Sequence, residues 1–218
     1  MPNSYQIETL KLALMDAVAP DPCRCYLCDE EAKVGEDGLC DDCRRTLLYC
    51  PDPVYRQPLD GLTVGLTYTD AVKDAVLRFK NGRKPEYAAF FAQYMRIPRE
   101  WEADILVPVP MHPLKEYTKK FHHTACLCAF LSGLYKIPYS RELLQKVRYT
   151  KPQKGLGAKA RQKNLHNSFF ADPHCEGLRI VLIDDVTTTG ATLCECAKMC
   201  KLAGAKAVYG CCAATPKL

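Results

Sequence analysis

The sequence has no apolar run that approaches the roughly 20 residues a helix needs to cross a bilayer. Its first segment also lacks the uninterrupted apolar stretch of a secretory signal, because Glu8, Lys11 and Asp16 interrupt it. Residues 4–18 instead show helical spacing of apolar side chains, so we expect an amphipathic helix within residues 1–19. Together these features predict a cytoplasmic protein with no membrane span.

Two common nucleotide-binding motifs are also missing. The chain contains neither the G-x-x-x-x-G-K-[ST] spacing of a Walker A loop nor the G-x-G-x-x-G fingerprint of dinucleotide folds. It shows no internal repeat and no low-complexity segment. The formal net charge of +5 permits an anionic partner without requiring one. Any phosphate site must therefore be built in another way.

Cysteine, in contrast, is abundant, with fourteen residues in two groups. In the first group, Cys25 and Cys28 form one C-x-x-C pair, and Cys40 and Cys43 form a second pair after eleven intervening residues. Each pair can aim two sulfurs at one point, and four thiolates complete the closed tetrahedral shell of a structural zinc ion. Two disulfides or a redox pair are the competing interpretation. Either Cys23 or Cys50 is a further candidate for the site.

The segment around these cysteines, residues 20–56, is too short to bury a core of its own, so we expect the metal to supply its stability. Gly35 and Gly38 predict a small hairpin over residues 30–39. Seven further cysteines lie in apolar surroundings, where small buried thiols are expected. These are Cys126, Cys128, Cys194, Cys196, Cys200, Cys211 and Cys212.

Residues 57–218 alternate apolar strands with amphipathic helices. This order predicts an α/β fold with an open parallel sheet and helices on both of its faces. The expected strands cover residues 62–68, 104–110, 167–170, 178–183 and 207–213. The expected helices cover residues 70–80, 86–95, 118–135 and 190–203.

The segment from Val181 to Leu193 carries the clearest functional pattern, V-L-I-D-D-V-T-T-T-G-A-T-L. It places two carboxylates and a Thr/Gly turn between a buried strand and a helix, where open α/β sheets bind ligands. Exposed N–H groups and the helix dipole make such a turn attractive to a phosphate group. The carboxylates suit ribose hydroxyls, with Mg2+ bridging to a pyrophosphate through oxygens. The alternative is a threonine-capped helix with two solvated acids.

A basic stretch precedes this segment. Seven basic residues and no acidic residue lie between Lys146 and Lys163. They fit either a solvated loop or a loop that faces a phosphate.

Taken together, the motifs resemble the ComF family of phosphoribosyltransferase-like competence proteins, also described as GntX-like, whose ligand loop is that of type I phosphoribosyltransferases. The resemblance covers about residues 20–215. It rests on the four cysteines and five further segments: residues 78–82 (RFKNG), 107–110 (VPVP), 152–153 (PQ), 161–164 (RQKN) and 184–190 (DDVTTTG).

The resemblance implies a type I phosphoribosyltransferase-like fold that binds PRPP with Mg2+. Asp184 and Asp185 would hold the ribose hydroxyls, and Arg161 would lie on a flexible loop that closes over the ligand. These three are the implied catalytic residues. The remaining PRPP contacts would come from Thr187, Thr188, Thr189, Gly190, Thr192, Val109, Pro110 and Lys80.

One segment departs from the family pattern. Where family members carry Arg-Gly-Phe-Asn-Gln, this chain has Lys119, Lys120, Phe121, His122 and His123. A lysine point charge thereby replaces the bidentate arginine fork, and imidazoles replace the amides.

The resemblance implies a PRPP-binding protein of DNA uptake in natural transformation, with single-stranded DNA and an uptake helicase as partners. The alternatives are an active transferase that passes phosphoribose from PRPP to a nitrogen base or amine, and a PRPP-sensing regulator without catalysis.

Overall fold

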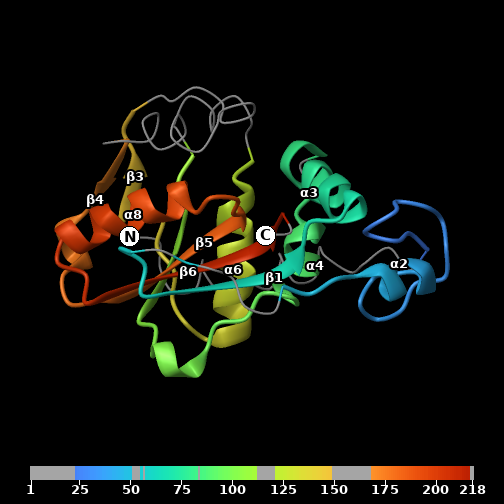
Figure 1. Ribbon diagram of the computed structural model, residues 1–218, viewed down its shortest axis with the longest axis horizontal. Helices are drawn as coiled ribbons and strands as arrows, with labels where there is room; N and C mark the ends of the chain where they lie inside the picture. The colour runs from blue at the N-terminus through green and yellow to red at the C-terminus, as the bar shows by residue number, and fades with distance from the viewer. Residues whose placement is uncertain are drawn as a thin grey trace, which may run out of the picture.

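The computed structural model describes residues 23–50, 55, 57–82, 84–111, 121–148 and 168–216. Its centre is a four-stranded parallel sheet in the order β1-β6-β5-β2 (Figure 1). Strand β1 spans Gly61–Thr67, β2 spans Ile105–Pro108, β5 spans Arg179–Val186 and β6 spans Ala207–Thr215. The central pair β5–β6 aligns Ile183 with Cys211.

Alternate residues of β5 feed two separate hydrophobic cores. Val181 and Ile183 face the core that contains α3 (Asp70–Gly82), α4 (Glu86–Ala92) and α6 (His123–Tyr135). Ile180 and Leu182 face the other core, which contains α8 (Ala191–Leu202) and the antiparallel pair β3 (Leu144–Lys146) and β4 (Phe169–Ala171). Helices therefore cover both faces of the parallel sheet, which confirms the predicted fold class.

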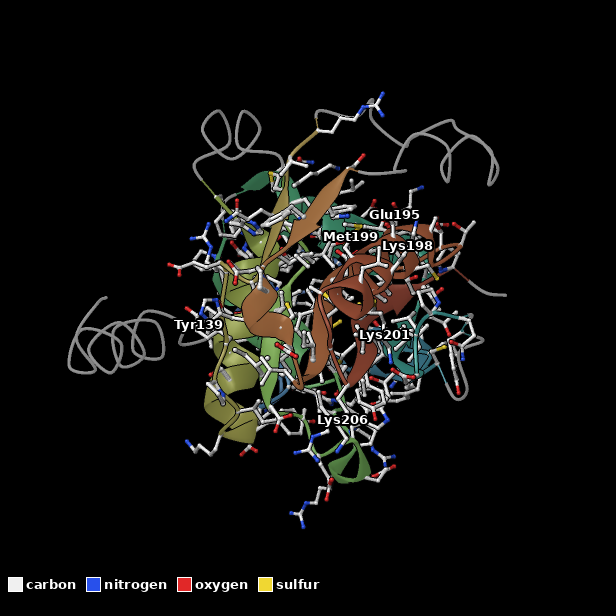
Figure 2. All side chains as sticks on the ribbon, turned by 90° about the vertical axis from the view of Figure 1, so that its left-hand side faces the viewer. Tyr139, Glu195, Lys198, Met199, Lys201 and Lys206 are labelled. Atoms are coloured by element: carbon white, nitrogen blue, oxygen red, sulfur yellow. The ribbon has the colours of Figure 1, made fainter. Side chains whose placement is uncertain are left out.

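The shorter elements lie around this frame. They are α2 (Asp41–Thr46) and the 3-10 turns η1 (Arg99–Trp101) and η2 (Pro173–Cys175). Figure 2 looks onto the side of the molecule that carries α8, where the labelled Lys201 pairs with Asp60 at 2.7 Å. No helix among the described residues is long and apolar enough to span a bilayer.

Several predicted boundaries are wrong. Helix α3 continues through Asn81 and Gly82, and α4 ends at Ala92 rather than 95. Within the described residues, α6 begins at His123 instead of including Phe121 and His122, because His122 caps it by accepting the Ala125 N–H at Nδ1, 3.3 Å away. The predicted N-terminal helix, residues 1–19, lies outside the described residues.

The cysteine segment packs against the body. Tyr26 stacks on Phe90 of α4, with ring centroids 5.0 Å apart. Arg78 of α3 donates to the backbone carbonyls of Tyr26 and Leu27. Of the predicted hairpin over residues 30–39, the structure forms the turn but no pair of strands: the Gly38 N–H donates to the Gly35 carbonyl at 2.9 Å, and the Gly35 N–H donates to the Leu39 carbonyl at 3.1 Å.

Candidate functional site

The Thr/Gly loop lies between the end of β5 and the start of α8. Thr187 is tied to the sheet, because its N–H donates to the Ala214 carbonyl at 3.0 Å. Gly190 precedes α8 with φ of 71°, a left-handed conformation that glycine adopts without strain. The loop surrounds a small pocket. Its lining residues are Asp184, Val186, Thr187, Thr188, Thr189, Gly190, Ala191, Thr192 and Leu193.

The structure separates the two adjacent aspartates. Strand β5 continues through both, so their side chains point to opposite faces of the sheet. Asp184 is half-buried, lines the pocket, and accepts the Asp185 N–H at Oδ1, 2.9 Å away. Burial and the negative charge of Asp185 raise the pKa of Asp184 to about 8. Its carboxyl is therefore held largely protonated at neutral pH.

Asp185 lies on the other face, with only 5% of its side chain exposed. Its Oδ2 lies 2.9 Å from Lys80 Nζ and 2.9 Å from His123 Nε2, and its Oδ1 accepts the Val186 N–H at 2.6 Å. Burial by itself would raise the pKa of Asp185, but the attraction of Lys80 and His123 outweighs burial and lowers it. Asp185 is thus a buried anion with balanced charge.

The predicted Lys80 contact is therefore to Asp185, and His123 is a participant that the sequence prediction did not include. Its signal was present in the departure from the family pattern at residues 119–123. His123 begins α6, which lies against β5 and β2. The imidazole occupies a position where the family carries an amide, and an imidazole Nε2–H can donate to a carboxylate as an amide does.

The loop after β2 approaches the same end of β5. The Val109 N–H donates to the Ile183 carbonyl at 2.9 Å, and the Val109 carbonyl accepts the Thr124 hydroxyl at 2.9 Å. The Met111 N–H lies 3.4 Å from His122 Nε2. A neutral imidazole has one acceptor nitrogen, so His122 accepts from either Met111 or Ala125 at one time. Val109 and Pro110 are thereby anchored beside the carboxyl end of β5.

Other predicted positions are not part of the described structure. Arg161, Lys119 and Lys120 lie outside the described residues, as does most of the basic stretch. At its described beginning, Lys146 Nζ lies 5.2 Å from the centroid of the Phe169 ring, a cation–π contact.

The four cysteines of the two C-x-x-C pairs do converge. The sulfurs of Cys25, Cys28, Cys40 and Cys43 all lie within 4.8 Å of one another, and those of Cys28 and Cys40 are 4.0 Å apart. A tetrahedral zinc with four Zn–S bonds needs sulfurs about 3.8 Å apart. The group therefore has the number, type and spacing of ligands for a metal ion such as zinc. Cys23 and Cys50 are not members of it.

The surroundings of Cys25 favour its ligand form. Burial raises the pKa of this thiol, but backbone N–H groups, including that of Cys40 at 3.4 Å, outweigh burial and bring it to about 7. A thiol must lose its proton to bind a metal ion. The fold thus favours loss of the proton from this candidate ligand. Elsewhere, Cys128, Cys196, Cys200, Cys211 and Cys212 are buried as predicted, whereas Cys126 and Cys194 are partly buried.

No family model matches the chain. Curated relatives are similar to most of its length. The DNA utilization protein YhgH of Escherichia coli is 26% identical over 214 residues, which cover 86% of this chain and 94% of that protein. Competence protein F of Haemophilus influenzae is 23% identical over 85% of this chain and 93% of its own length. Competence protein ComFC of Bacillus subtilis is 28% identical over 80% and 76%.

Solved structures give a more distant likeness. The glutamine PRPP amidotransferase from B. subtilis, in complex with ADP and GMP, is 20% identical with a TM-score of 0.38. The match covers 61% of this chain and 26% of that one.

Proposed function

We propose that this chain, whose similarity to competence and DNA utilization proteins supports a ComF-family assignment, binds a phosphorylated ribose such as PRPP and acts in the uptake or use of DNA. The observation that carries the binding half is the pocket between β5 and α8. It brings backbone N–H groups, threonine hydroxyls and a carboxyl group to one small cavity.

The phosphate group of the ligand lies, in this proposal, on the loop from Thr187 to Thr192. Helix α8 has twelve residues, and the N–H groups of its first turn have no partners within the helix. The positive end of the helix dipole adds to their attraction for an anion. The hydroxyls of Thr188, Thr189 and Thr192 supply further donors at the same place.

The ribose and the diphosphate follow from the neighbouring residues. Asp184 lines the pocket and is the carboxyl group we assign to a ribose hydroxyl. Asp185 supports the site from behind, since its carboxylate is buried between Lys80 and His123. Val109 and Pro110 lead into the loop assigned to the diphosphate, and Arg161 is the residue we expect to close over it.

Mg2+ is the expected companion of PRPP, but Asp185 does not fit it as a direct ligand. Both carboxylate oxygens are engaged, one by the Val186 N–H and the other by Lys80 and His123. We therefore assign Mg2+ to the diphosphate oxygens of PRPP and not to this carboxylate.

The four-cysteine cluster has a different role in this proposal. We assign zinc to it, because four thiolates leave no open position for a substrate and fill a structural site. The cluster segment packs against α4 through Tyr26, so we assign it a structural role. The exposed Leu48 and Tyr49 follow the helix that carries Cys43, and offer a surface for single-stranded DNA or for an uptake helicase.

The decisive experiment measures PRPP binding by calorimetry and pyrophosphate release from PRPP across a panel of bases and amines, with and without single-stranded DNA. We expect PRPP binding and DNA binding. Pyrophosphate release that depends on an acceptor would establish the transferase alternative. PRPP binding without DNA binding or turnover would favour a PRPP-sensing regulator.

The proposal fails if the protein binds none of PRPP, ribose 5-phosphate and nucleotides. A matched pair of variants links binding to the pocket. Thr188→Ala removes an exposed hydroxyl within it, whereas Thr63→Ala removes a hydroxyl that donates to the Arg96 carbonyl outside the pocket lining. Only the first should lower PRPP affinity.

A further inference from the structure

The buried cluster of Lys80, Asp185 and His123 has a consequence for the cation requirement of the site. Asp185 joins three elements, because Lys80 comes from the last turn of α3, His123 begins α6, and Asp185 ends β5. The two contacts to Oδ2 are equally short, at 2.9 Å. With Oδ1 accepting the Val186 N–H, both oxygens have close partners.

Charge is balanced inside this cluster. Burial would by itself lower the pKa of Lys80, but the negative charge of Asp185 outweighs burial and raises it, so the ammonium keeps its proton. One buried carboxylate thus faces one ammonium and one imidazole nitrogen. A buried charge that is paired in this way needs no further counter-ion.

A divalent cation would meet two obstacles beside Asp185. Mg2+ binds oxygen ligands at about 2.0–2.1 Å in nearly octahedral geometry, and it favours anionic carboxylates. Lys80 Nζ and His123 Nε2 each already lie 2.9 Å from Oδ2. The ammonium would also repel the ion across a buried space, where charges are poorly screened.

We propose that Lys80 and His123 take the place of a divalent cation at Asp185, so that this chain binds a phosphorylated ribose without an ion held by this carboxylate. This proposal rests on the proposed function for the identity of the ligand. The cation itself is tested on the protein without ligand.

The first test uses the wild-type protein and ribose 5-phosphate, which has no diphosphate of its own to carry Mg2+. Its dissociation constant is measured by calorimetry in Mg2+-free buffer without chelator and again in excess Mg2+. We expect the two values to agree within about threefold. A tenfold or greater gain with Mg2+ would overturn the proposal, by about 1.4 kcal/mol of cation-dependent binding.

The second test compares variants of α3 by thermal denaturation without ligand, in Mg2+-free buffer without chelator and in excess Mg2+. Lys80→Gln leaves Asp185 without its ammonium, so we expect a lowered melting temperature that Mg2+ partly restores. Lys80→Arg keeps the positive charge and should not respond to Mg2+. Lys73→Gln, on the exposed side of the same helix, is the control for loss of a surface lysine.

The outcomes separate this proposal from the proposed function. If Mg2+ raises the melting temperature of the wild type above that of its sample in Mg2+-free buffer, or if Lys80→Gln gains nothing from Mg2+, the proposal is wrong. If Lys80→Gln does not fold, the wild-type measurements still decide. If ribose 5-phosphate does not bind at all, the proposed function fails, while the ligand-free melting curves continue to test the cation.

Discussion

The four-cysteine site and the Thr/Gly pocket are assembled in different ways. The cysteine site takes all of its ligands from residues 25–43, where two turns bring the sulfurs together. The pocket and its supporting carboxylates depend on residues far apart in sequence, since Lys80 and His123 both reach Asp185. The cysteine site is local in sequence and depends on a bound ion. The Asp185 cluster is built by tertiary packing, and its charge is balanced by side chains.

This difference has an energetic meaning. The four sulfurs lie within 4.8 Å of one another, so their thiolates would repel one another. A bound metal ion attracts all four thiolates and offsets this repulsion. The Asp185 cluster needs no such ion, because its charges are balanced by side chains already in place. Loss of one cysteine ligand should therefore disrupt the whole metal site, whereas loss of one side chain from the Asp185 cluster should lower stability only in part.

The largest effect should come from Cys25→Ser. Zinc bound to a structural site contributes about 10–16 kcal/mol in small zinc domains, and loss of a thiolate removes much of that. We expect the variant to lose the metal and the ordered cysteine segment, measured as zinc content per chain and as the rate of proteolysis within residues 23–50.

Cys23→Ser is the matched control, since Cys23 is not a member of the four-sulfur group. It should retain about one zinc per chain and resist the protease as the wild type does. Stable, metal-free wild-type protein with an intact cysteine segment would contradict the assignment.

A smaller effect is expected from Asp185→Asn. The amide leaves Lys80 and His123 without their anion, which should lower the free energy of unfolding by about 2–3 kcal/mol, less than for a fully buried pair because Lys80 is partly exposed. Urea denaturation at neutral pH measures the loss. The exposed Asp74→Asn on α3 is the control and should change little.

The stabilising effect of Asp185 should depend on pH. The pKa of Asp185 in the folded protein lies below its ordinary value of about 3.9, so its contribution is complete above that value and declines as the pH falls below it. The difference in the free energy of unfolding between wild type and Asp185→Asn should therefore become smaller at acid pH. A gap that widens in acid would be inconsistent with the ion pair.

Asp184→Asn should have the opposite effect on stability. The pKa of Asp184 is raised to about 8, so the folded state binds more protons than the unfolded state between about pH 4 and 8, and stability falls as the pH rises through that range. The amide removes this loss, and we expect about 1–2 kcal/mol of added stability near pH 8. Urea denaturation across this pH range measures it.

The same substitution should weaken PRPP binding, because it removes the carboxyl group that lines the pocket. A substitution that raises the stability of the protein but lowers its affinity for PRPP indicates that the original residue serves ligand binding and not folding. An Asp184→Asn protein that is less stable than wild type near pH 8 would show that the carboxylate is stabilised in the fold.

The smallest effect is expected from Thr188→Ala. Its side chain is exposed in the loop, so the free energy of unfolding should hardly change. Loss of one hydroxyl donor to a phosphate should weaken PRPP binding by about 1 kcal/mol, measured by calorimetry. Unchanged affinity would place the phosphate elsewhere.

The sequence predicted the cysteine site and the order of strands and helices, because both depend on short-range patterns. C-x-x-C spacing fixes where two sulfurs point, and continuous apolar runs such as that of β5 indicate buried parallel strands. The carboxylate pair at the end of β5 was also found by its position between a strand and a helix. These patterns do not indicate which role each of the two aspartates has.

What the sequence could not show is how the pair divides. Because β5 continues through both aspartates, one faces α8 and the other faces α3 and α6. Strand length is decided by pairing with β6, where Val186 still aligns with Ala214. The partnership of His123 with Asp185 also arises only when α6 packs against the sheet, a contact with no local signature.

The strand order has a consequence for the synthesis of the protein. β6 lies between β1 and β5, although it follows both in the chain. Strand β1 therefore gains its neighbour in the parallel sheet only when residues 207–215 have been synthesised, roughly 150 residues after β1 itself. Until then, the facing edges of β1 and β5 present unpaired backbone N–H and C=O groups, which are a template for pairing with other chains.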